Sequence, residues 1–106
     1  MAKSDRGKQS MGDIAPALAD YTDRVLFDDL WARPDLSPRD RSLITVAALT
    51  ALYRQNELPA HFKRALENGV TREELVETIT HLAFYAGWPN ANTAIAALRQ
   101  VLAETQ

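Results

Sequence analysis

The 106-residue chain contains no cysteine, four glycines and two histidines. The lack of cysteine excludes disulfide bonds, thiolate catalysis and thiolate metal ligands. Four glycines leave little material for a phosphate-binding loop, and neither a Walker A nor a GxGxxG motif occurs. Two histidines without an HExxH element make a structural metal site unexpected.

Long apolar runs and a strong charge of either sign are also missing. No apolar stretch approaches the roughly 20 residues of a membrane span, so we expect no membrane partner. Twelve Lys and Arg residues against 14 Asp and Glu residues give a net charge of −2. This near-balance, without a basic stripe interleaved with aromatics, predicts no nucleic-acid partner.

The composition is that of a small globular protein, since 46% of the residues are hydrophobic. Residues 1–12 are polar and basic and lack the apolar segment of a secretory signal. We therefore expect a polar tail over 1–12, followed by a single domain over 13–106. Cytoplasmic residence is the default expectation.

The first half of the chain predicts two helices. Asp13 is a candidate N-cap for a helix with Pro16 in its first turn, which runs to about Trp31. A second helix begins at Ser37 and Pro38. Its segment 43–53 is apolar on nearly every side, so we expect it to be buried all round, either centrally or at a subunit contact.

The second half predicts three more helices. Asn56 is a candidate N-cap for the first of them, and Gly69 is its left-handed terminator. Thr71 and Glu74 form a capping box that opens the next helix. Gly87 ends that helix before the last one begins. With no strand pattern and no internal repeat, the sequence predicts a compact all-α bundle of about five helices.

Glu57 stands four residues before His61, which suggests a catalytic pair. In a continuous helix the two residues share a face, and an acid beside an imidazole is a common general acid–base arrangement. Alternatively, Glu57 only favours the helix dipole and His61 is a surface residue. Pro59 strengthens this alternative, because the residue before a proline avoids helical geometry. If Leu58 is the cap, Glu57 lies outside the helix and the shared face is lost.

A second pair with the same spacing, Glu77 and His81, is followed by Tyr85. We expect an exposed polar stripe on an amphipathic helix, with a cleft or a subunit contact as the alternative for His81 and Tyr85. Tyr85, Trp88 and Pro89 make an apolar knot at a helix junction. Because aromatic residues usually serve packing, a packed corner is the favoured interpretation of this knot.

Several motifs together resemble the carboxymuconolactone decarboxylase family. They are "RSL" at Arg41, the element E-x3-H-x3-A-x3-G from Glu57 to Gly69, and Tyr-x-Gly-x-Pro at Tyr85, Gly87 and Pro89. The similarity runs from about Leu30 to Leu102. It implies an all-helical, alkylhydroperoxidase D-like fold that assembles as a homo-oligomer, commonly a hexamer.

The thiol branch of that family carries the motif CxxCxxxH. Aligned on His61, the motif would place its cysteines at Arg54 and Glu57, so the absence of thiolates excludes peroxidase and disulfide-reductase activity. Glu57 with His61 is the pattern of the decarboxylase branch. The resemblance therefore implies a cofactor-free lyase of aromatic compound catabolism. Its substrate would be a small anionic lactone or enolisable acid.

For this chemistry, His61 is the expected proton donor or oxyanion partner, and Glu57 is expected to orient it. Arg41 and Arg54 are candidates to hold a substrate carboxylate.

Tyr85 and Trp88 are candidates for an apolar wall that excludes water from the site. The alternative function is a non-catalytic oligomeric or ligand-binding member of the same fold, because folds outlive functions. A pocket holding Glu57, His61 and an arginine would favour the enzyme, whereas an exposed or separated pair would favour the alternative.

Overall fold

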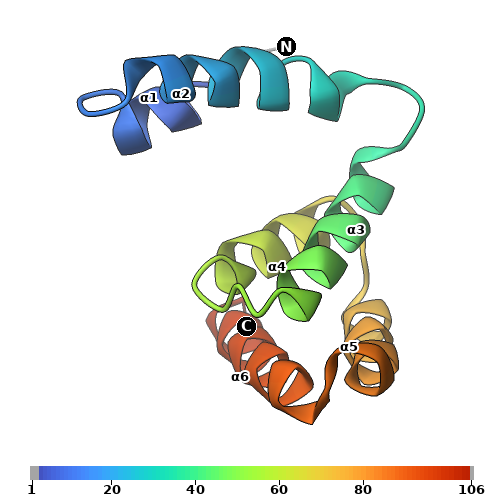
Figure 1. Cartoon of the computed structure of the whole chain (residues 1–106). Coiled ribbons are helices and arrows are strands. Elements are labelled where there is room, and N and C mark those ends of the chain that lie inside the picture. Colours follow the sequence, from blue (N-terminus) through green and yellow to red (C-terminus); the bar gives the residue numbers. More distant parts are fainter. Residues whose placement is uncertain (1–2, 106) are drawn as a thin grey trace. The chain divides into compact units, whose positions relative to one another are not determined.

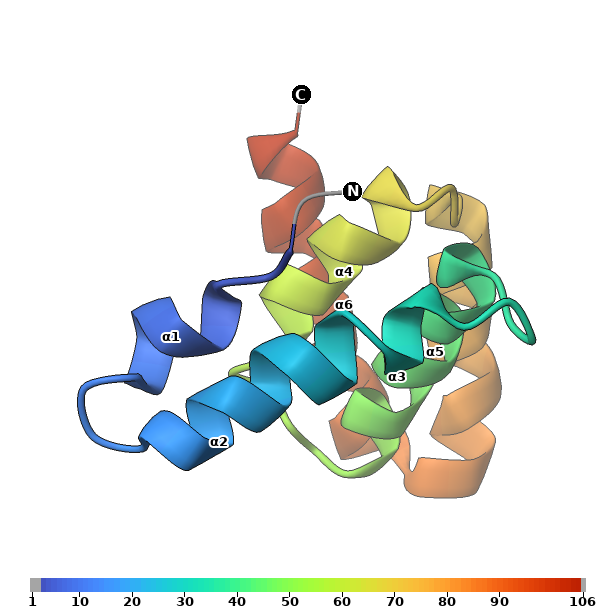
Figure 2. The same ribbon diagram turned by 90° about the horizontal axis from the view of Figure 1, so that it is seen from above.

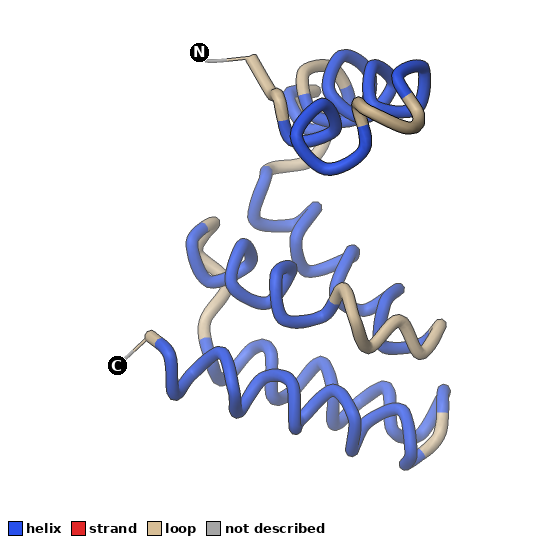
Figure 3. Tube along the Cα trace, turned by 90° about the vertical axis from the view of Figure 1, so that its left-hand side faces the viewer, coloured by secondary structure: helices blue, strands red, loops and turns tan. Residues whose placement is uncertain are grey.

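The computed structural model describes residues 3–105, so residues 1 and 2 of the predicted tail and residue 106 of the predicted domain lie outside the described residues. Within the described range every regular element is a helix, which confirms the all-α prediction (Figure 3). The contacts divide the chain into a unit that ends at Pro38 and a unit that begins at Arg39.

The first unit is a chain of short helices. They are α1 (Arg6–Met11), α2 (Pro16–Asp20), the π-helix η1 (Tyr21–Phe27) and the 3₁₀-helix η2 (Leu30–Ala32). Figure 2 shows α1 folded back beside α2. Pro16 opens α2 as predicted, but the N-cap is Ala15, so Asp13 was the wrong cap. The regular helix predicted up to Trp31 was also wrong, because the backbone changes to π geometry after Asp20.

The close approach of α1 to the following helices depends on Gly7. A Cβ atom at this position would lie 2.5 Å from the Ala19 carbonyl oxygen and 2.8 Å from Cβ of Thr22. The Gly7 amide and the Ser4 hydroxyl both donate to Oδ1 of Asp23, at 2.8 and 2.7 Å. Part of the segment predicted as a tail is therefore a packed helix, while a domain boundary at residue 12 stays a prediction.

The second unit consists of the four longer helices. They are α3 (Pro38–Ala51), α4 (Leu58–Glu67), α5 (Arg72–Ala86) and α6 (Trp88–Glu104) (Figure 1). Gly87 has φ of 102° and separates α5 from α6 as predicted. This sharp junction lets α5 and α6 pack against each other along their lengths (Figure 3).

Two sequence signals fix the connection between α4 and α5. Gly69 has φ of 99°, and its amide donates to the Leu66 carbonyl at 3.1 Å while the Val70 amide donates to Ala65 at 2.9 Å. This pair of bonds is a Schellman motif, which needs a left-handed residue at the glycine position. The predicted capping box between Thr71 and Glu74 is confirmed.

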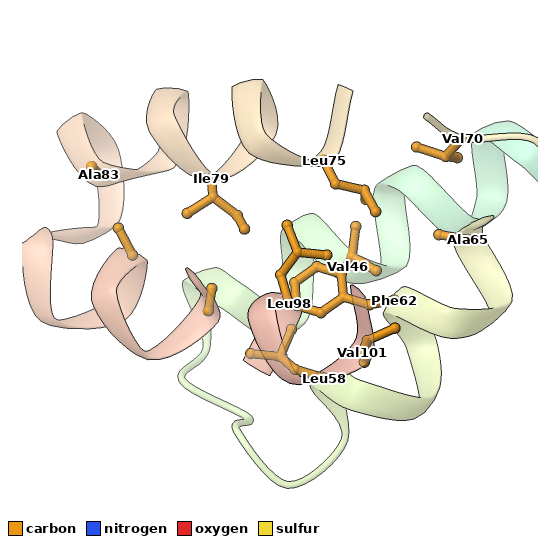
Figure 4. Packing of buried hydrophobic residues seen from close by; sticks show 12 residues of the cluster. Val46, Leu58, Phe62, Ala65, Val70, Leu75, Ile79, Ala83, Leu98 and Val101 are labelled. Carbon is orange, nitrogen blue, oxygen red and sulfur yellow. The ribbon is translucent and has the colours of Figure 1, made fainter. Parts of the chain in front are cut away.

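The core of this unit is built from apolar side chains of all four helices (Figure 4). They include Val46 of α3, Leu58, Phe62 and Ala65 of α4, Leu75 and Ile79 of α5, and Leu98 and Val101 of α6. Phe62 is fully buried. Burial of a side chain of this size contributes about 1.5–3 kcal/mol relative to exposure, so α4 is anchored firmly in the unit.

Helix α3 buries only one of its faces in the described chain. Ser42, Val46 and Thr50 are buried, but Ile44 is 55% and Leu52 is 66% exposed. The expectation that segment 43–53 is buried on all sides within the domain was therefore wrong. Its surplus apolar face reaches solvent, and the subunit contact offered as the alternative stays a prediction.

Candidate functional site

The Glu57–His61 pair lies at the start of α4. Glu57 is the N-cap residue, with helical φ of −91° and ψ of −16°, so Asn56 was the wrong cap. The His61 amide donates to the Glu57 carbonyl at 3.3 Å. Pro59 falls in the first turn of α4, where no amide donor is required, so it does not interrupt the turn. Glu57 and His61 therefore occupy consecutive turns of one helical segment.

The two side chains differ in their exposure to solvent. Glu57 is exposed, whereas His61 is half-buried. His61 follows Leu58 by three positions and precedes Ala65 by four, and both of these residues belong to the buried face of α4. His61 therefore lies beside the buried face of α4 and keeps part of its surface accessible to solvent.

Arg54 joins this pair through the preceding turn. The Glu57 amide donates to the Arg54 carbonyl at 3.2 Å. Arg54, Glu57 and His61 are thereby linked by successive backbone hydrogen bonds. The Arg54 side chain is exposed.

The loop that carries Arg54 begins at a left-handed tyrosine. Tyr53 has φ of 61° and is the one non-glycine residue with positive φ in the described part of the chain. Its amide donates to Thr50 at 3.2 Å, and the Arg54 amide donates to Leu49 at 2.8 Å. Helix α3 therefore ends in a Schellman motif with a bulky residue at the position that favours glycine.

Residues of α6 hold this end of α3. The Asn90 side-chain amide donates to the Thr50 and Ala51 carbonyls at 3.0 and 3.1 Å. The Thr93 hydroxyl donates to the Tyr53 hydroxyl at 3.3 Å. Sequence analysis missed Tyr53, Asn90 and Thr93 as supports of the site, since each belongs to a contact about 40 residues distant in the chain.

The structure does not bring Arg41 and Arg54 together. Arg41 is in the first turn of α3 and Arg54 follows the end of that helix. The ten residues from Arg41 to Ala51 rise about 15 Å along the helix axis. The two arginines thus flank opposite ends of α3, and joint binding of one carboxylate stays a prediction without support from this geometry.

A further arginine, Arg64, lies one turn after His61 on the same helix. Asn68, one turn further on, donates from its side-chain amide to the Ser42 hydroxyl at 2.9 Å, which ties this end of α4 to the start of α3 beside Arg41. Arg64 and Arg41 are half-buried, and each has one guanidinium nitrogen shielded from solvent. Arg64 follows His61 by three residues, and this helical spacing could have identified Arg64 from the sequence.

The aromatic residues at the α5–α6 junction are exposed. Tyr85 stacks on His81 with ring centroids 4.8 Å apart, and Trp88 meets Phe84 edge to face at 5.0 Å. Tyr85 is 79% and Trp88 is 55% exposed, so the packed-corner interpretation was wrong. Glu77 and His81 are both exposed, as the polar-stripe interpretation predicts, and the subunit contact offered as the alternative for His81 and Tyr85 stays a prediction. A role for Tyr85 and Trp88 as a water-excluding wall stays a prediction.

Neither a metal centre nor a membrane span occurs in the described part of the chain. Residues 3–105 contain no group of three or more His, Asp or Glu side chains placed to hold a metal ion. None of the helices over the same range combines the length and the apolar character that crossing a bilayer requires.

Comparison with known families identifies the group to which this arrangement belongs. The sequence model of the carboxymuconolactone decarboxylase family matches residues 16–100. The chain belongs to this family. The match begins at the first residue of α2, so α1 precedes it, and it spans the segment that carries Glu57 and His61.

Two relatives carry names that describe a reaction. The chain is 37% identical over 91 residues to a 4-carboxymuconolactone decarboxylase of Acinetobacter baylyi, a match that covers 86% of this chain and 68% of that protein. It is 36% identical over 66 residues to a nitrosuccinic acid decarboxylase of Metarhizium robertsii, which covers 62% of this chain and 46% of that protein. Both relatives of this family member are thus named as decarboxylases.

Proposed function

We propose that this family member is a cofactor-free decarboxylase that acts on a small anionic lactone or enolisable acid. The observation that carries the proposal is the 37% identity, over 86% of the chain, to a protein named 4-carboxymuconolactone decarboxylase. The chain is also similar to a second decarboxylase, which is named for a different substrate. The two names together support the reaction type, decarboxylation, more strongly than they support either substrate.

The two named substrates share an electronic feature. In carboxymuconolactone, electrons released from the carboxylate can pass through an alkene into the lactone carbonyl. In nitrosuccinic acid, a nitro group on the carbon that bears a carboxyl group can accept them. The bond from carbon to carboxylate breaks, its electron pair moves into the acceptor, carbon dioxide leaves, and a proton then adds to carbon. The substrate is its own electron sink, so no cofactor is required.

The protein then has to stabilise the developing enolate or nitronate and deliver one proton. We assign proton delivery or charge stabilisation to His61, whose half-buried position gives it a partly dry environment. We assign to Glu57 the role of orienting the imidazole, because the backbone hydrogen bond places the two residues on consecutive turns. An imidazole at the edge of a core interacts more strongly with developing charge than one in bulk water.

Binding of the anionic substrate falls to the arginines. Arg64 is one turn from His61, and Arg41 lies on the neighbouring helix near the Ser42–Asn68 contact. We therefore propose Arg41 and Arg64 as the carboxylate-binding pair, because a guanidinium matches a carboxylate in a bidentate geometry. Arg54 follows the opposite end of α3 and is not assigned to this pair.

The experiment is a direct assay of carbon dioxide release from 4-carboxymuconolactone and from nitrosuccinate. The matched control is the saturated lactone acid, in which the path of electrons from the carboxylate to the lactone carbonyl is broken. We expect release from at least one of the activated acids and none from the saturated control. Absence of release from every activated acid tested would contradict the proposal.

We also propose that the protein works as a homo-oligomer, a hexamer. The support is the apolar surface that the second unit leaves exposed, with Ile44 55%, Leu52 66% and Phe84 75% accessible to solvent. Contact with other copies of the chain would remove these apolar side chains from water, which favours association.

A second candidate function is ligand binding without turnover. The exposed position of Glu57 favours it, since an orienting carboxylate in an enzyme is normally shielded from water. Calorimetric titration separates the two functions: heat of binding without carbon dioxide release supports this candidate, and turnover excludes it.

A further inference from the structure

A cavity between α5 and α6 has the chemistry of an anion site and lies outside the proposed active site. Its volume is about 360 Å³, which is within the range of small-molecule pockets. The lining side chains come from the first turns of α5 and the C-terminal half of α6, two helices that lie side by side (Figures 1 and 3).

The cavity has an apolar lining with two cations. Val76, Ile95, Leu98 and Leu102 supply the apolar part, and Leu98, only 2% exposed, continues into the core of the unit. Arg72 and Arg99 are the charged lining residues, one from each helix. A ligand with an apolar body and an anionic head matches both parts of this surface.

Neither guanidinium group has a counter-ion among the described residues. Among residues 3–105, the side chains of Arg72 and Arg99 make no hydrogen bond and no ion pair. Of the carboxylates next to the lining residues in sequence, Glu104 accepts a hydrogen bond from Gln100 at 3.4 Å. Two arginines without partners beside apolar surface favour an anion whose charge they can share.

The backbone of α5 does not compete for this role. The capping box uses the Thr71 and Glu74 amides. The charged groups that line the cavity are the guanidinium groups of Arg72 and Arg99. A phosphate or sulfate alone would leave the apolar lining unused, whereas a carboxylic acid with an alkyl or aryl body would cover it.

We propose that this cavity is a second ligand site, which binds a small organic monocarboxylate. Its carboxylate lies between Arg72 and Arg99, and its alkyl or aryl body covers Val76, Ile95 and Leu98. The site is independent of the proposed decarboxylase function, because its lining contains none of the residues assigned to the reaction.

The test is calorimetric titration of the full chain with hexanoate and benzoate, with hexanamide and benzamide as neutral probes of the same shape. We expect saturable binding of the acids and at least about fivefold weaker binding of the amides. Arg72→Gln and Arg99→Gln should each weaken acid binding by a similar factor, while Lys63→Gln, which removes an exposed charge of α4, should leave it unchanged. Equal affinity for acids and amides would overturn the proposal.

Amide NMR shifts locate the site. We expect saturable shifts in the first turns of α5 and in residues 95–103, and their loss in Ala103→Trp, which fills the cavity. Circular dichroism of each variant confirms that its helices are intact. Shifts confined to other helices would overturn the proposal. Shifts of these same cavity residues on concentrating the protein alone would also overturn it, because they would assign the cavity to a second copy of the chain.

Discussion

The backbone amide of His61 donates a hydrogen bond to the carbonyl oxygen of Glu57 at 3.3 Å, across the intervening Pro59. Proline at this position could have moved Glu57 off the helix. Instead Glu57 keeps helical backbone angles as the N-cap residue. The backbone therefore holds Glu57 and His61 one helical turn apart, independently of any contact between their side chains.

This geometry predicts unequal effects of two substitutions at Glu57. Glu57→Gln keeps a hydrogen-bonding side chain of the same size, so it should lower kcat less than removal of the imidazole if Glu57 only orients His61. Glu57→Ala should lower kcat further. Steady-state kinetics with the substrate found in the assay checks this, and a Glu57→Gln loss as large as that of His61→Ala would assign the proton to Glu57.

The left-handed conformation of Tyr53 predicts a stabilising substitution. Tyr53→Gly should raise the free energy of unfolding by about 1 kcal/mol, because glycine adopts positive φ without the steric cost that a side chain incurs. Tyr53→Ala loses the contact with Thr93 yet keeps the backbone cost, so it serves as the matched control. Urea denaturation measures both, and a glycine variant less stable than the alanine variant would refute this account of Tyr53.

The lowered pKa of Glu74 predicts how the free energy of unfolding depends on pH. Hydrogen bonds from the Thr71 amide and then from Arg39 lower the pKa of Glu74 below its ordinary value of 4.5. A lowered pKa in the folded state means that the stabilisation is present above pH 4.5 and is lost as the pH falls through the lowered value. Unfolding measured between about pH 3 and pH 6 should show this loss.

The loss of stability in acid should be smaller in Glu74→Gln, which cannot ionise. Glu73→Gln is the matched control, since Glu73 is the exposed neighbour outside the capping box. If the Glu74 and Glu73 variants show the same acid dependence as the wild type, the capping box does not contribute to it.

The exposed apolar side chains of α3 and of the turn that follows it predict self-association. Light scattering at micromolar concentration should give the mass of a hexamer for the wild type. Ile44→Glu and Leu52→Glu should each reduce that mass, because burial of a charge in an apolar contact is costly. Lys63→Glu on α4 should not change it. A monomeric wild type would end this proposal.

Local signals predicted the parts of the fold that neighbouring residues determine. Thr71 and Glu74 lie three positions apart and satisfy each other, so the start of α5 was readable from the sequence. Gly69 and Gly87 adopt the positive φ that glycine tolerates, so the helix ends they mark were readable too. The Glu57–His61 spacing was visible, but whether Pro59 preserved the turn required the structure.

Features that depend on tertiary contacts were not readable. The left-handed Tyr53 accepts a hydrogen bond at its hydroxyl from Thr93 of α6, and no residue near Tyr53 in the sequence indicates this contact. Gly7 permits a close approach to Ala19. The segment around Gly7 is therefore packed as a helix despite its polar composition. Apolar residues near Trp88 suggested a packed corner, because sequence cannot distinguish burial within a chain from a surface left for another molecule.

The central claim is that His61 takes part directly in decarboxylation, and the value of kcat for His61→Ala tests it most directly. General acid–base groups typically contribute about 10²–10⁴-fold in rate, so we predict a fall in kcat of at least about 10²-fold, with helical content and oligomeric mass unchanged. His81→Ala, which removes the exposed second histidine, should retain the wild-type kcat. Turnover by His61→Ala at the wild-type rate would contradict the account.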